Sequence, residues 1–445
     1  MGLSSSLFSA VSGLRGYGIA MSVTGDNIAN VNTLGFKASR ITFEDALSQL
    51  VATAAGSSQV GRGVAVSDIS MIFAQGSFET TSEPTDLAIG GKGFFILRDP
   101  NNLKTYYTRA GQFRFDADGR LVNPEGYIVQ GWRVQRNASG GVDIVGSITD
   151  IVISSTSSDP RPTAEVQIAV NLDASAETPS VAFDINDSST WLDASNYHTS
   201  ITVYDSFGQG HAVTVYFRYI GTDASGNRQW QWWATVQGSD TASGRDEACA
   251  TGVLTFNPDG VLVSESPSGG EDPENPGNPP DFDFSGGAAP DQVINFYFGL
   301  QPGAVSKTTQ FASPFATIYQ TQDGYSSGFL QTVSVDTDGV IYGHYTNGQI
   351  MPLFRIALAN FANPWGLLKE GGNLYSESNR TGEVVTGPPG TAGLGRIAPN
   401  SLEQSNVDLA NEFIKMIIFQ RAFQANSRVV TTTDDMMAEL INIKR

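Results

Sequence analysis

A serine inside a glycine-flanked pentapeptide is the strongest signal for covalent chemistry in this chain. Residues 324–328 read GYSSG and fit the G-x-S-x-G pattern of serine hydrolases, with Ser326 at the nucleophile position. Asp336 or Asp338 and then His344 follow in hydrolase order. A nucleophile elbow, however, needs a strand before the serine and a helix after it. Because the following FLQTVSV reads as a strand, we favour a Gly-Ser turn over a secreted serine hydrolase that uses Ser326.

The chain offers few ligands for a transition metal. Its three histidines, His198, His211 and His344, do not stand at helical or hairpin ligand spacing, and Cys249 is its single cysteine. A zinc site is therefore not expected. One cysteine excludes an intramolecular disulfide framework but leaves a free thiol or an intermolecular bond open. We predict no catalytic, cofactor-binding or metal site.

Three Asp-Gly phrases resemble calcium loops but predict turns. They are FDADGRLV, FNPDGVLV and VDTDGVIY, which begin at Phe115, Phe256 and Val335. Each lacks the third acidic ligand before the glycine and the later bidentate glutamate of a calcium loop. Asp-Gly between apolar runs instead indicates a tight hairpin turn with glycine at positive φ. The sequence GGKG at residues 90–93 lacks the Ser or Thr of a phosphate loop, and we interpret it as a hairpin bend.

The two ends of the chain predict helices that assemble with other helices. Apolar or small residues recur at heptad spacing near the start, at Leu3, Leu7, Ala10, Leu14, Tyr17, Met21, Ile28 and Val31. A second run near the end comprises Leu409, Phe413, Met416, Phe423, Val430, Met437 and Ile441, with polar interruptions. Such spacing gives each helix a narrow apolar stripe suited to a partner helix. Asp434 and Asp435 are expected on a solvated face.

Glycines weaken the first of these predicted helices. Gly13, Gly16, Gly18 and Gly25 each cost about 1 kcal/mol relative to alanine inside a helix. The N-terminal helix is therefore not expected to persist alone.

The middle of the chain predicts β-structure in two blocks around an insertion. Short apolar runs alternate with turn clusters over residues 78–132 and again over 321–361. The insertion predicts a hairpin around residues 206–210 and strands of its own. Its tryptophans, Trp230, Trp232 and Trp233, are expected to pack in a core. From Ser266 the segment SPSGGEDPENPGNPPDFDFSGG is rich in proline, glycine and acid and predicts an exposed loop.

Length and charge restrict the class of protein. At 445 residues the chain exceeds one core, so two or three domains are expected. The formal net charge of -19 makes nucleic acid an unsuitable partner. No stretch is long and apolar enough to insert into a membrane, and the start lacks the pattern of a cleaved signal peptide.

Several separate stretches resemble the bacterial flagellar axial proteins, and among them the hook proteins. GDNIANVNTLGFK at residues 25–37 is similar to the rod and hook signature, in which the matching positions are Asn27, Ala29, Asn30, Asn32, Gly35, Phe36 and Lys37. PTDLAIGGKGFFIL and YTRAGQFRFDADGRLVNPEGYIVQGW resemble the family's inner β-domain. SLEQSNVDLANEFIKMIIFQRAFQANSRVV, which begins at Ser401, resembles its C-terminal helix. YDSFGQGHAVTVYF at Tyr204 is similar to the insertion of hook proteins.

The resemblance implies an α+β multidomain fold. Residues 1–35 and 402–445 would form terminal helices that pair into an α-helical coiled coil, and residues 36–77 a linker or extended arm. Residues 78–153 and 321–401 would form an inner β-domain. Residues 154–320 would form an outer β-domain inserted into it, so that two mainly antiparallel β-domains are nested and discontinuous.

The resemblance also implies a structural subunit and not an enzyme. Hook proteins polymerise into a curved flexible tube with a central export channel, which transmits motor torque to the filament as a universal joint. The implied partners are other copies of the chain, rod proteins, the hook cap, hook-filament junction proteins and the flagellar type III export apparatus. The implied location is the extracellular hook on the basal body, reached without a cleaved signal peptide. A distal rod protein is the alternative, and the large insertion favours the hook.

Overall fold

The computed structural model describes residues 2–46, 49–53, 56–137, 140–154 and 156–443. The chain divides into two compact units. The first unit comprises Met1–Ser154, Gln331–His344 and Ile350–Arg445, and the second comprises Ser155–Leu330 and Tyr345–Gln349. The structure is mostly β, with a long helix near each end of the chain.

The first unit contains both long helices and most of the strands. The helices are α1 (Gly2–Ala29), α3 (Leu409–Ile443) and the short 3-10 helix η2 (Pro364–Gly366). Its strands in the first half of the chain are β1 (Ser39–Asp45), β2 (Gln49–Thr53), β3 (Gly56–Val60), β4 (Val64–Met71), β5 (Phe78–Thr80), β6 (Leu87–Gly90), β7 (Phe94–Arg98), β8 (Thr105–Thr108), β9 (Arg114–Phe115), β10 (Leu121–Val122), β11 (Ile128–Arg136) and β12 (Val142–Asp150). Those in the second half are β23 (Val340–Tyr345), β24 (Ile350–Ile356), β25 (Leu358–Phe361), β26 (Leu368–Gly371), β27 (Leu374–Ser376), β28 (Val384–Gly387), β29 (Arg396–Pro399) and β30 (Ser401–Glu403).

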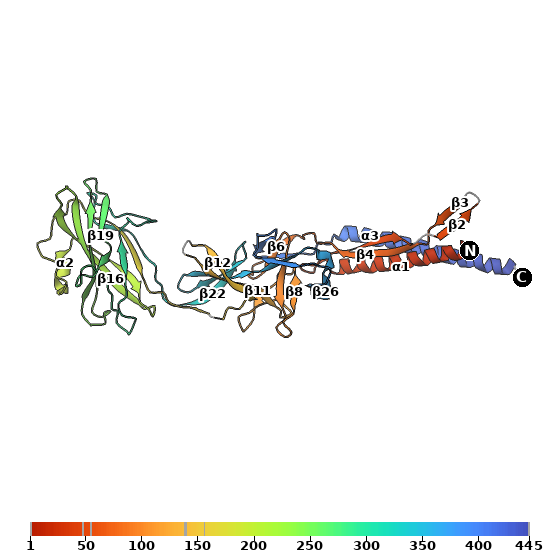
Figure 1. Ribbon diagram of the computed structural model, residues 1–445, viewed down its shortest axis with the longest axis horizontal. Coiled ribbons are helices and arrows are strands. Elements are labelled where there is room, and N and C mark those ends of the chain that lie inside the picture. The colour runs from red at the N-terminus through yellow and green to blue at the C-terminus, as the bar shows by residue number, and fades with distance from the viewer. Residues whose placement is uncertain (1, 47–48, 54–55, 138–139, 155, 444–445) are drawn as a thin grey trace. The chain divides into compact units, whose positions relative to one another are not determined.

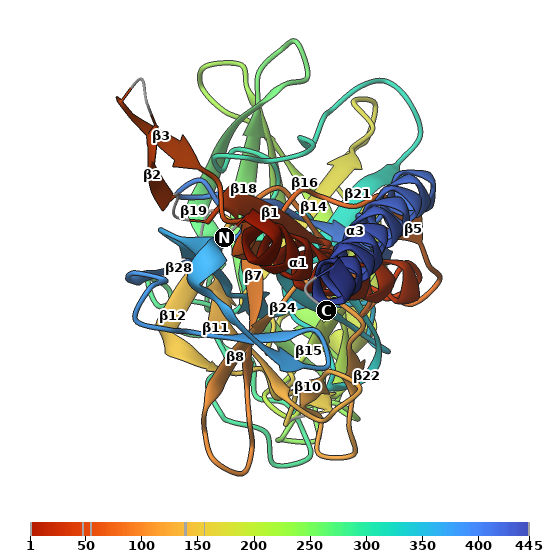
Figure 2. The same ribbon diagram turned by 90° about the vertical axis from the view of Figure 1, so that its right-hand side faces the viewer.

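Helices α1 and α3 lie side by side at one end of the first unit (Figure 1, Figure 2). The segment between α1 and β5, expected to be a linker or extended arm, contains an antiparallel ribbon of β1 and β4 with the β2–β3 hairpin between them. Figure 1 shows β4 running along α1. The Gly- and Ser-rich composition therefore does not prevent strand formation, because the ribbon packs against a helix.

Strands from the two sequence blocks of the first unit pair in one sheet. The strand order runs β22-β23-β24-β11-β7-β8-β27-β26, so that β24 from the second block lies beside β11 from the first. Strand β22 (Gly328–Val335) has residues in both units. A core of Leu, Ile, Val and Phe side chains supports the sheet, among them Leu87, Phe95, Val129, Ile341 and Ile356.

The second unit is built around an eight-stranded sheet and an aromatic core. Its elements are β13 (Ser157–Ser158), β14 (Glu165–Asn171), η1 (Ser188–Thr190), α2 (Trp191–Ala194), β15 (Tyr197–Tyr204), β16 (Gly210–Thr222), β17 (Arg228–Val236), β18 (Glu247–Phe256), β19 (Leu262–Glu271), β20 (Asn295–Tyr297) and β21 (Ala316–Gln322). The order is β15-β16-β17-β18-β19-β20-β14-β21, with β14 and β20 parallel. The Thr317 hydroxyl, which donates to the Thr199 hydroxyl and shares a hydrogen bond with that of Tyr197, links the first and last strands of this order.

Several local predictions are confirmed. The hairpin around residues 206–210 joins β15 and β16, with Tyr204 opposite Gly210. All three tryptophans predicted in the core are buried. The glycines of the three Asp-Gly phrases, Gly119, Gly260 and Gly339, have φ of 74°, 78° and 74°.

Two local predictions are wrong. The glycines at residues 90–93 turn the chain, but β6 and β7 on either side do not form a hairpin, because β6 pairs with β29 and β7 pairs with β8 and β11.

The segment from Ser266 is not simply an exposed loop. Its first residues belong to β19, and Phe282 and Phe284 are buried in the core because they alternate with solvent-facing aspartates.

Candidate assembly site

The predicted assembly residues other than Val31 lie on α1 and α3, which run antiparallel. Near the end of α1, the Asn27 Nδ2 donates to the Glu412 Oε2 in the first turn of α3 over 3.1 Å. Further toward the start of α1, a Cβ placed on Gly13 would lie 2.8 Å from the Asn426 Oδ1. Residue numbers therefore rise along one helix as they fall along the other.

Small residues bring the two helices close together. Ala10, Ala20, Thr24 and Asn27 are buried along the side of α1 that also carries Gly13. A side chain at Gly13 would have to displace Asn426, whereas one at Gly18 would meet no atom within 4 Å. The sequence treats these glycines only as helix-weakening residues, but Gly13 permits a close helix contact.

Three aromatic rings connect α1, β1 and α3. The ring centroid of Tyr17 is 5.5 Å from that of Phe43 and 6.2 Å from that of Phe419, and the latter two lie 6.4 Å apart. Phe43 and Phe419 are outside the predicted heptad stripes. Phe419 stands one residue before the polar interruption Gln420, so the buried stripe of α3 is displaced from the predicted one at this turn.

The predicted stripe of α1 is mainly covered within the chain. Ala10 is buried and Leu7, Leu14, Tyr17, Met21, Ile28 and Val31 are half-buried. The side chain of Leu3 lies outside the described ones. Val31 falls after the helix, which ends at Ala29.

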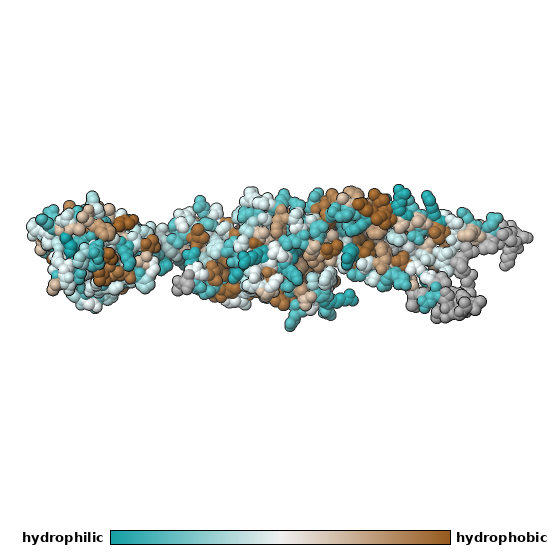
Figure 3. Space-filling model, turned by 90° about the horizontal axis from the view of Figure 1, so that it is seen from above, coloured by the Kyte–Doolittle hydropathy of each residue, from teal (hydrophilic) through white to brown (hydrophobic). Residues whose placement is uncertain are grey.

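The predicted stripe of α3 is mainly exposed. Met416 and Val430 are half-buried, whereas Leu409, Phe413, Phe423, Met437 and Ile441 are exposed. Phe413 has 51% of its surface exposed, and Ile414, Ile417 and Ile418 are exposed beside it. Figure 3 shows hydrophobic side chains gathered on the helical part of the first unit. Among the α3 side chains that the structure describes, the fully buried ones are polar, Glu412 and Thr433.

Asn27 ties the end of α1 to both β1 and α3. Its Oδ1 accepts from the Ser39 amide over 2.8 Å, and its Nδ2 donates to the Ser39 carbonyl over 2.8 Å as well as to Glu412. Lys415 in turn donates to the Glu412 Oε1 over 2.6 Å. Because Asn27 is buried and its donor and acceptor are both satisfied, it fixes the position of α1 on the ribbon.

A buried ion cluster joins the two terminal segments beyond the helices. We call Lys37, Arg109 and Glu403 the Glu403 cluster. The Lys37 Nζ lies 2.7 Å from the Glu403 Oε1, and the Arg109 guanidinium lies 3.4 Å from the Glu403 Oε2. The Gly76 amide also donates to the Glu403 Oε1 over 2.9 Å. One carboxylate therefore compensates two buried cations.

Burial dominates the electrostatics of the Glu403 cluster. It lowers the pKa of Lys37 and that of Arg109, and Glu403 opposes both shifts. The cations have further acceptors, because Lys37 donates to the Ala74 carbonyl over 2.9 Å and Arg109 to the Gly91 carbonyl over 2.8 Å. Removing the carboxylate would leave two desolvated cations without a counterion.

Backbone contacts complete this junction. Gly35 has a φ of 67°, and a Cβ there would lie 2.6 Å from the Ala110 amide nitrogen, so only glycine fits. Its amide donates to the Glu403 carbonyl over 2.7 Å. Asn406 accepts from the Ala38 amide over 2.8 Å and donates to the Ile72 and Ala74 carbonyls.

The structure separates the signature residues into two groups. Asn27, Gly35, Phe36 and Lys37 are buried at the junction of the terminal segments. Ala29 and Asn32 are exposed, and Asn30 makes local bonds to Asp26 and Thr33.

Sequence reasoning missed Arg109, Glu403, Asn406 and Glu412 as site residues. All four lie inside stretches that resemble the family, but nothing local marks them as partners of residues hundreds of positions away.

The residues considered for hydrolase chemistry do not form a catalytic arrangement. Ser326 lies between β21 and β22, so a strand follows it where a nucleophile elbow has a helix. His344 bonds a different serine, with 2.8 Å between its Nε2 and the Ser334 Oγ. Asp336 accepts from the amides of Asp338 and Val340 and shapes the turn between β22 and β23.

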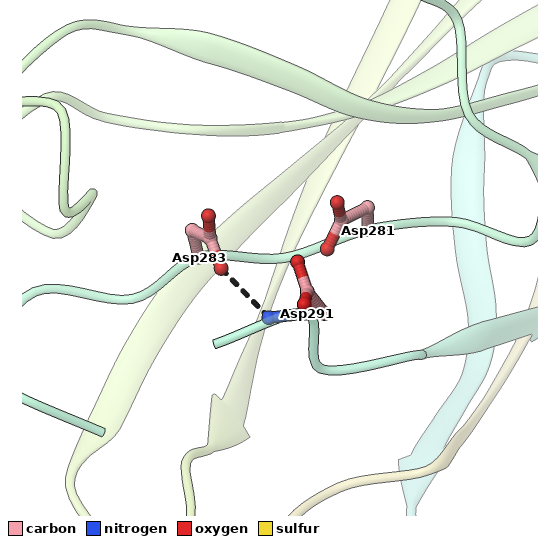
Figure 4. Close-up of side chains that lie close together, drawn as sticks. All are labelled: Asp281, Asp283 and Asp291. Carbon is pink, nitrogen blue, oxygen red and sulfur yellow. Dashed lines mark hydrogen bonds between the residues drawn. The ribbon is translucent and has the colours of Figure 1, made fainter. Parts of the chain in front are cut away.

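Three aspartates of the second unit form the one group of clustered metal-ligating side chains in the described part of the chain. Carboxylate oxygens of Asp281, Asp283 and Asp291 lie within 4.8 Å of one another (Figure 4). The Asp291 amide donates to the Asp283 Oδ1 over 2.7 Å. Burial, then the neighbouring carboxylates, raise the pKa of Asp281. Partly exposed carboxylates gather in this way without a cation, and we assign no metal site here.

Family models match the chain in four consecutive parts. The model described as flagella basal body rod protein matches residues 7–37, and the flagellar hook protein FlgE/F/G D1 domain matches 88–173. The flagellar basal body protein FlaE D2 domain matches 171–325, and the flagellar basal body rod FlgEFG protein C-terminal model matches 398–443.

Full-length relatives carry the name flagellar hook protein FlgE. The chain is 35% identical to that of Borreliella burgdorferi and 37% identical to that of Treponema pallidum, each over 99% of this chain and 99% of the relative. It is 32% identical to that of Escherichia coli over 98% of this chain and 99% of the relative. The crystal structure of Helicobacter pylori flagellar hook protein FlgE2 is similar in fold, with a TM-score of 0.52, 16% identity, and coverage of 73% of this chain and 100% of that one.

Proposed function

Because the chain belongs to the flagellar hook protein family, we propose that α1 and α3 form a coiled coil that holds each subunit in the hook. The chain is a structural subunit of the bacterial flagellar hook, the curved flexible tube that surrounds an export channel and transmits motor torque to the filament as a universal joint.

The exposed apolar surface of α3 carries the proposal. Within one chain, α3 buries polar residues against α1 and leaves Phe413, Ile414, Ile417 and Ile418 facing outward. A contiguous patch of large apolar side chains on a soluble subunit marks an interaction surface. In a homopolymer the simplest partner for it is a helix of another copy. We therefore assign Leu409, Phe413, Met416, Phe423, Val430, Met437 and Ile441, with the α1 stripe from Leu3 to Val31, to subunit assembly.

The Glu403 cluster supports different mechanical roles for the two units of the subunit. Buried charges and backbone bonds attach both helices to the sheet of the first unit, so that the helices and this sheet behave as one rigid body under load. The second unit has its own core and sheet. We propose that bending of the hook is accommodated by exchangeable polar contacts between second units of neighbouring copies, which are weak individually.

The remaining partners follow from the hook assignment. We propose contacts with rod proteins, the hook cap and hook-filament junction proteins at the ends of the tube, and delivery by the flagellar type III export apparatus without a cleaved signal peptide. None of the described helices is long and apolar enough to cross a membrane.

Replacing two apolar residues of α3 tests the proposal. Phe413→Asp with Met416→Asp should abolish tubes formed by the purified chain after salting-out, seen by electron microscopy, because charge would be buried between copies. The monomer should keep its circular dichroism spectrum. Ala425→Asp with Thr432→Asp, at exposed positions of α3 turned away from Phe413 and Met416, is the matched control and should still give tubes. Normal tubes from the first variant would contradict the proposal.

A further inference from the structure

The chain crosses between its two units four times. The crossings follow Ser154, Leu330, His344 and Gln349. The last two leave only Tyr345–Gln349 in the second unit, and these residues comprise the end of β23 and the turn to β24. We call them the Asn347 turn. Two strands of the first unit are therefore joined by a turn that belongs to the second.

Local bonds shape the Asn347 turn. The Gly348 amide donates to the Tyr345 carbonyl over 3.0 Å, and the Tyr345 amide donates to the Gln349 carbonyl over 2.9 Å. Gly348 has a φ of 78°, which glycine adopts without strain. The Asn347 Oδ1 accepts from the Gln349 amide over 3.1 Å. The turn thus uses the side-chain oxygen of Asn347 and leaves its Nδ2 for partners outside the turn.

The segments that enter and leave the second unit form a paired ribbon. They are residues 156–163 and 323–330, which we call the connecting ribbon. Strand β13 pairs with the start of β22, and Arg161 and Tyr325 exchange backbone hydrogen bonds of 3.0 and 2.9 Å. The Arg161 guanidinium also lies 2.7 Å from the Asp323 carboxylate. Backbone pairing of this kind makes the connection more rigid than two separate linkers.

Asn347 binds both strands of the connecting ribbon. Its Nδ2 donates to the Ser326 carbonyl over 2.8 Å and to the Ser158 Oγ over 3.2 Å. Ser158 is buried, and its Oγ also accepts from the Gly328 amide over 3.1 Å. A Cβ on Gly328 would lie 2.5 Å from the Asn347 Cγ, so the close approach of Asn347 requires glycine at this position.

Two further contacts hold the connecting ribbon within the second unit. The Thr346 amide donates to the Phe329 carbonyl over 2.9 Å, and the Thr346 hydroxyl accepts from the Phe329 amide over 3.0 Å. The turn between β15 and β16 also packs on the ribbon, because a Cβ on Gly208 would lie 2.6 Å from the Pro160 Cβ and 3.2 Å from the Ser326 Cα. The Asn347 turn therefore binds a ribbon that is already fixed.

We infer that Asn347 acts as a latch, whose side-chain amide holds the turn between β23 and β24 on the connecting ribbon and so limits motion between the two units. While the latch is closed, the turn moves with the second unit. When it opens, the connecting ribbon alone joins the units. Because every contact of the latch lies within one chain, the inference does not depend on the proposed coiled coil and is testable in the soluble monomer.

Hydrogen exchange measures opening of the latch. Asn347→Asp keeps the acceptor for the turn but places a carboxylate oxygen against the Ser326 carbonyl in place of a donor. Exchange of the Thr346 and Phe329 amides should become about 5- to 30-fold faster, as expected when one or two hydrogen bonds are lost. Asn102→Asp adds the same charge at an exposed turn of the first unit, keeps its side-chain acceptor and is the control.

A second variant opens the latch without adding charge. Gly328→Ala should speed exchange of the same amides, because the new methyl group takes the place of Asn347. Gly61→Ala, at an exposed glycine with no atom within 4 Å of the new Cβ, is its control. Amides of β16 and β17 should keep their protection in all four variants, which shows that the second unit stays folded. Unchanged exchange at Thr346 and Phe329 in both latch variants would overturn the inference.

Spin labels on the two units measure the motion itself. In a Cys249→Ala chain, labels at Ala117→Cys of the first unit and Ala224→Cys of the second occupy exposed turns. The distribution of distances between the labels, from pulsed electron paramagnetic resonance of the monomer, should broaden in Asn347→Asp and Gly328→Ala and stay unchanged in the two controls. Equal widths in all variants would overturn the inference and leave the proposed function intact, since that function is tested on tubes.

Discussion

Glu403 is the residue on which the junction of the two chain ends depends most. Its carboxylate contacts Lys37, Arg109 and the Gly76 amide, all in a site with almost no solvent. Removing one cation leaves a paired carboxylate, but removing the carboxylate leaves two buried cations. Replacing Glu403 should therefore lower the free energy of unfolding more than replacing either cation.

Substitutions in the Glu403 cluster are expected to destabilise the first unit in a fixed order. Glu403→Gln should lower the free energy of unfolding by about 3–5 kcal/mol, because charge remains buried without a counterion. Lys37→Met should cost less, about 1.5–3 kcal/mol, because Arg109 still compensates Glu403. Urea denaturation measures both values.

An exposed ion pair provides the comparison. Lys104 lies 3.3 Å from Glu370, with both side chains substantially in solvent, so Lys104→Met should change stability by less than about 1 kcal/mol. Equal losses in Glu403→Gln and Lys37→Met would show that the carboxylate does not compensate both cations.

The aspartate cluster of the second unit predicts a pH dependence. The pKa of Asp281 is raised by burial and by Asp283 and Asp291, so the folded state favours its protonated form. This contribution to stability is fully present below about pH 4 and is lost as the pH rises through the raised pKa. Asp281→Asn should therefore raise the melting temperature at pH 7 by about 1–3 °C, and the gain should vanish near pH 4.

Scanning calorimetry at both pH values measures this effect. Asp159→Asn removes an exposed carboxylate elsewhere in the second unit and is the control for net charge. A gain from Asp281→Asn that is equally large at pH 4 would indicate a cause other than charge repulsion.

The sequence could not predict the individual partners at this scale. Lys37 and Glu403 are separated by 366 positions, and Asn27 and Glu412 by 385. Their contacts arise only when the chain ends meet, so no spacing marks them. The Asp-Gly turns were predictable because their geometry is local: Asp116 and Asp336 each accept from amides two and four residues on.

At the scale of elements, the glycines of α1 differ in the space that surrounds them. Gly13 lies against Asn426, whereas Gly18 has open space around it. A helix propensity scale treats the two alike. Their environments predict opposite effects of a larger side chain.

Leucine at these two positions should separate the two effects. Gly18→Leu should stabilise α1 by about 0.5–1 kcal/mol, because leucine is a better helix former than glycine. Gly13→Leu should weaken the pairing of α1 with α3, because the new side chain occupies the place of Asn426. Limited proteolysis of the monomer reports on the pairing, and faster cleavage of α1 in Gly18→Leu than in Gly13→Leu would contradict this account.

Heptad spacing was sufficient to locate both helices but not the side of α3 that contacts α1. The stripe predicted on α3 favours apolar residues, whereas the chain buries Glu412, Thr433 and the half-buried Asn426 there. Polar residues can occupy a helix contact when specific partners satisfy them, and a hydrophobic pattern does not register such pairs. The Pro-rich segment was wrongly predicted to be an exposed loop for a related reason. Its buried residues Phe282 and Phe284 alternate with aspartates, so the acidic composition conceals them.

At the scale of the whole molecule, the two long helices and the large aromatic core belong to different units of the chain. The first unit holds both helices and the Glu403 cluster, and the second has an independent aromatic core. The boundaries of the four predicted segments remain a prediction, although β7, β11 and β24 show that distant blocks of the chain share a sheet. We propose that the exposed surface of α3 contacts other copies of the chain, because a polymer supplies partners that a single chain lacks.

A helical reconstruction by electron cryomicroscopy of tubes formed from the purified chain tests the central claim most directly. The account predicts that α1 and α3 line the innermost part of the tube and that Phe413 and Met416 lie within 4.5 Å, roughly the limit of apolar contact, of side chains from another copy. Tubes in which these side chains contact no neighbouring copy, and in which only the β-rich units meet, would contradict it.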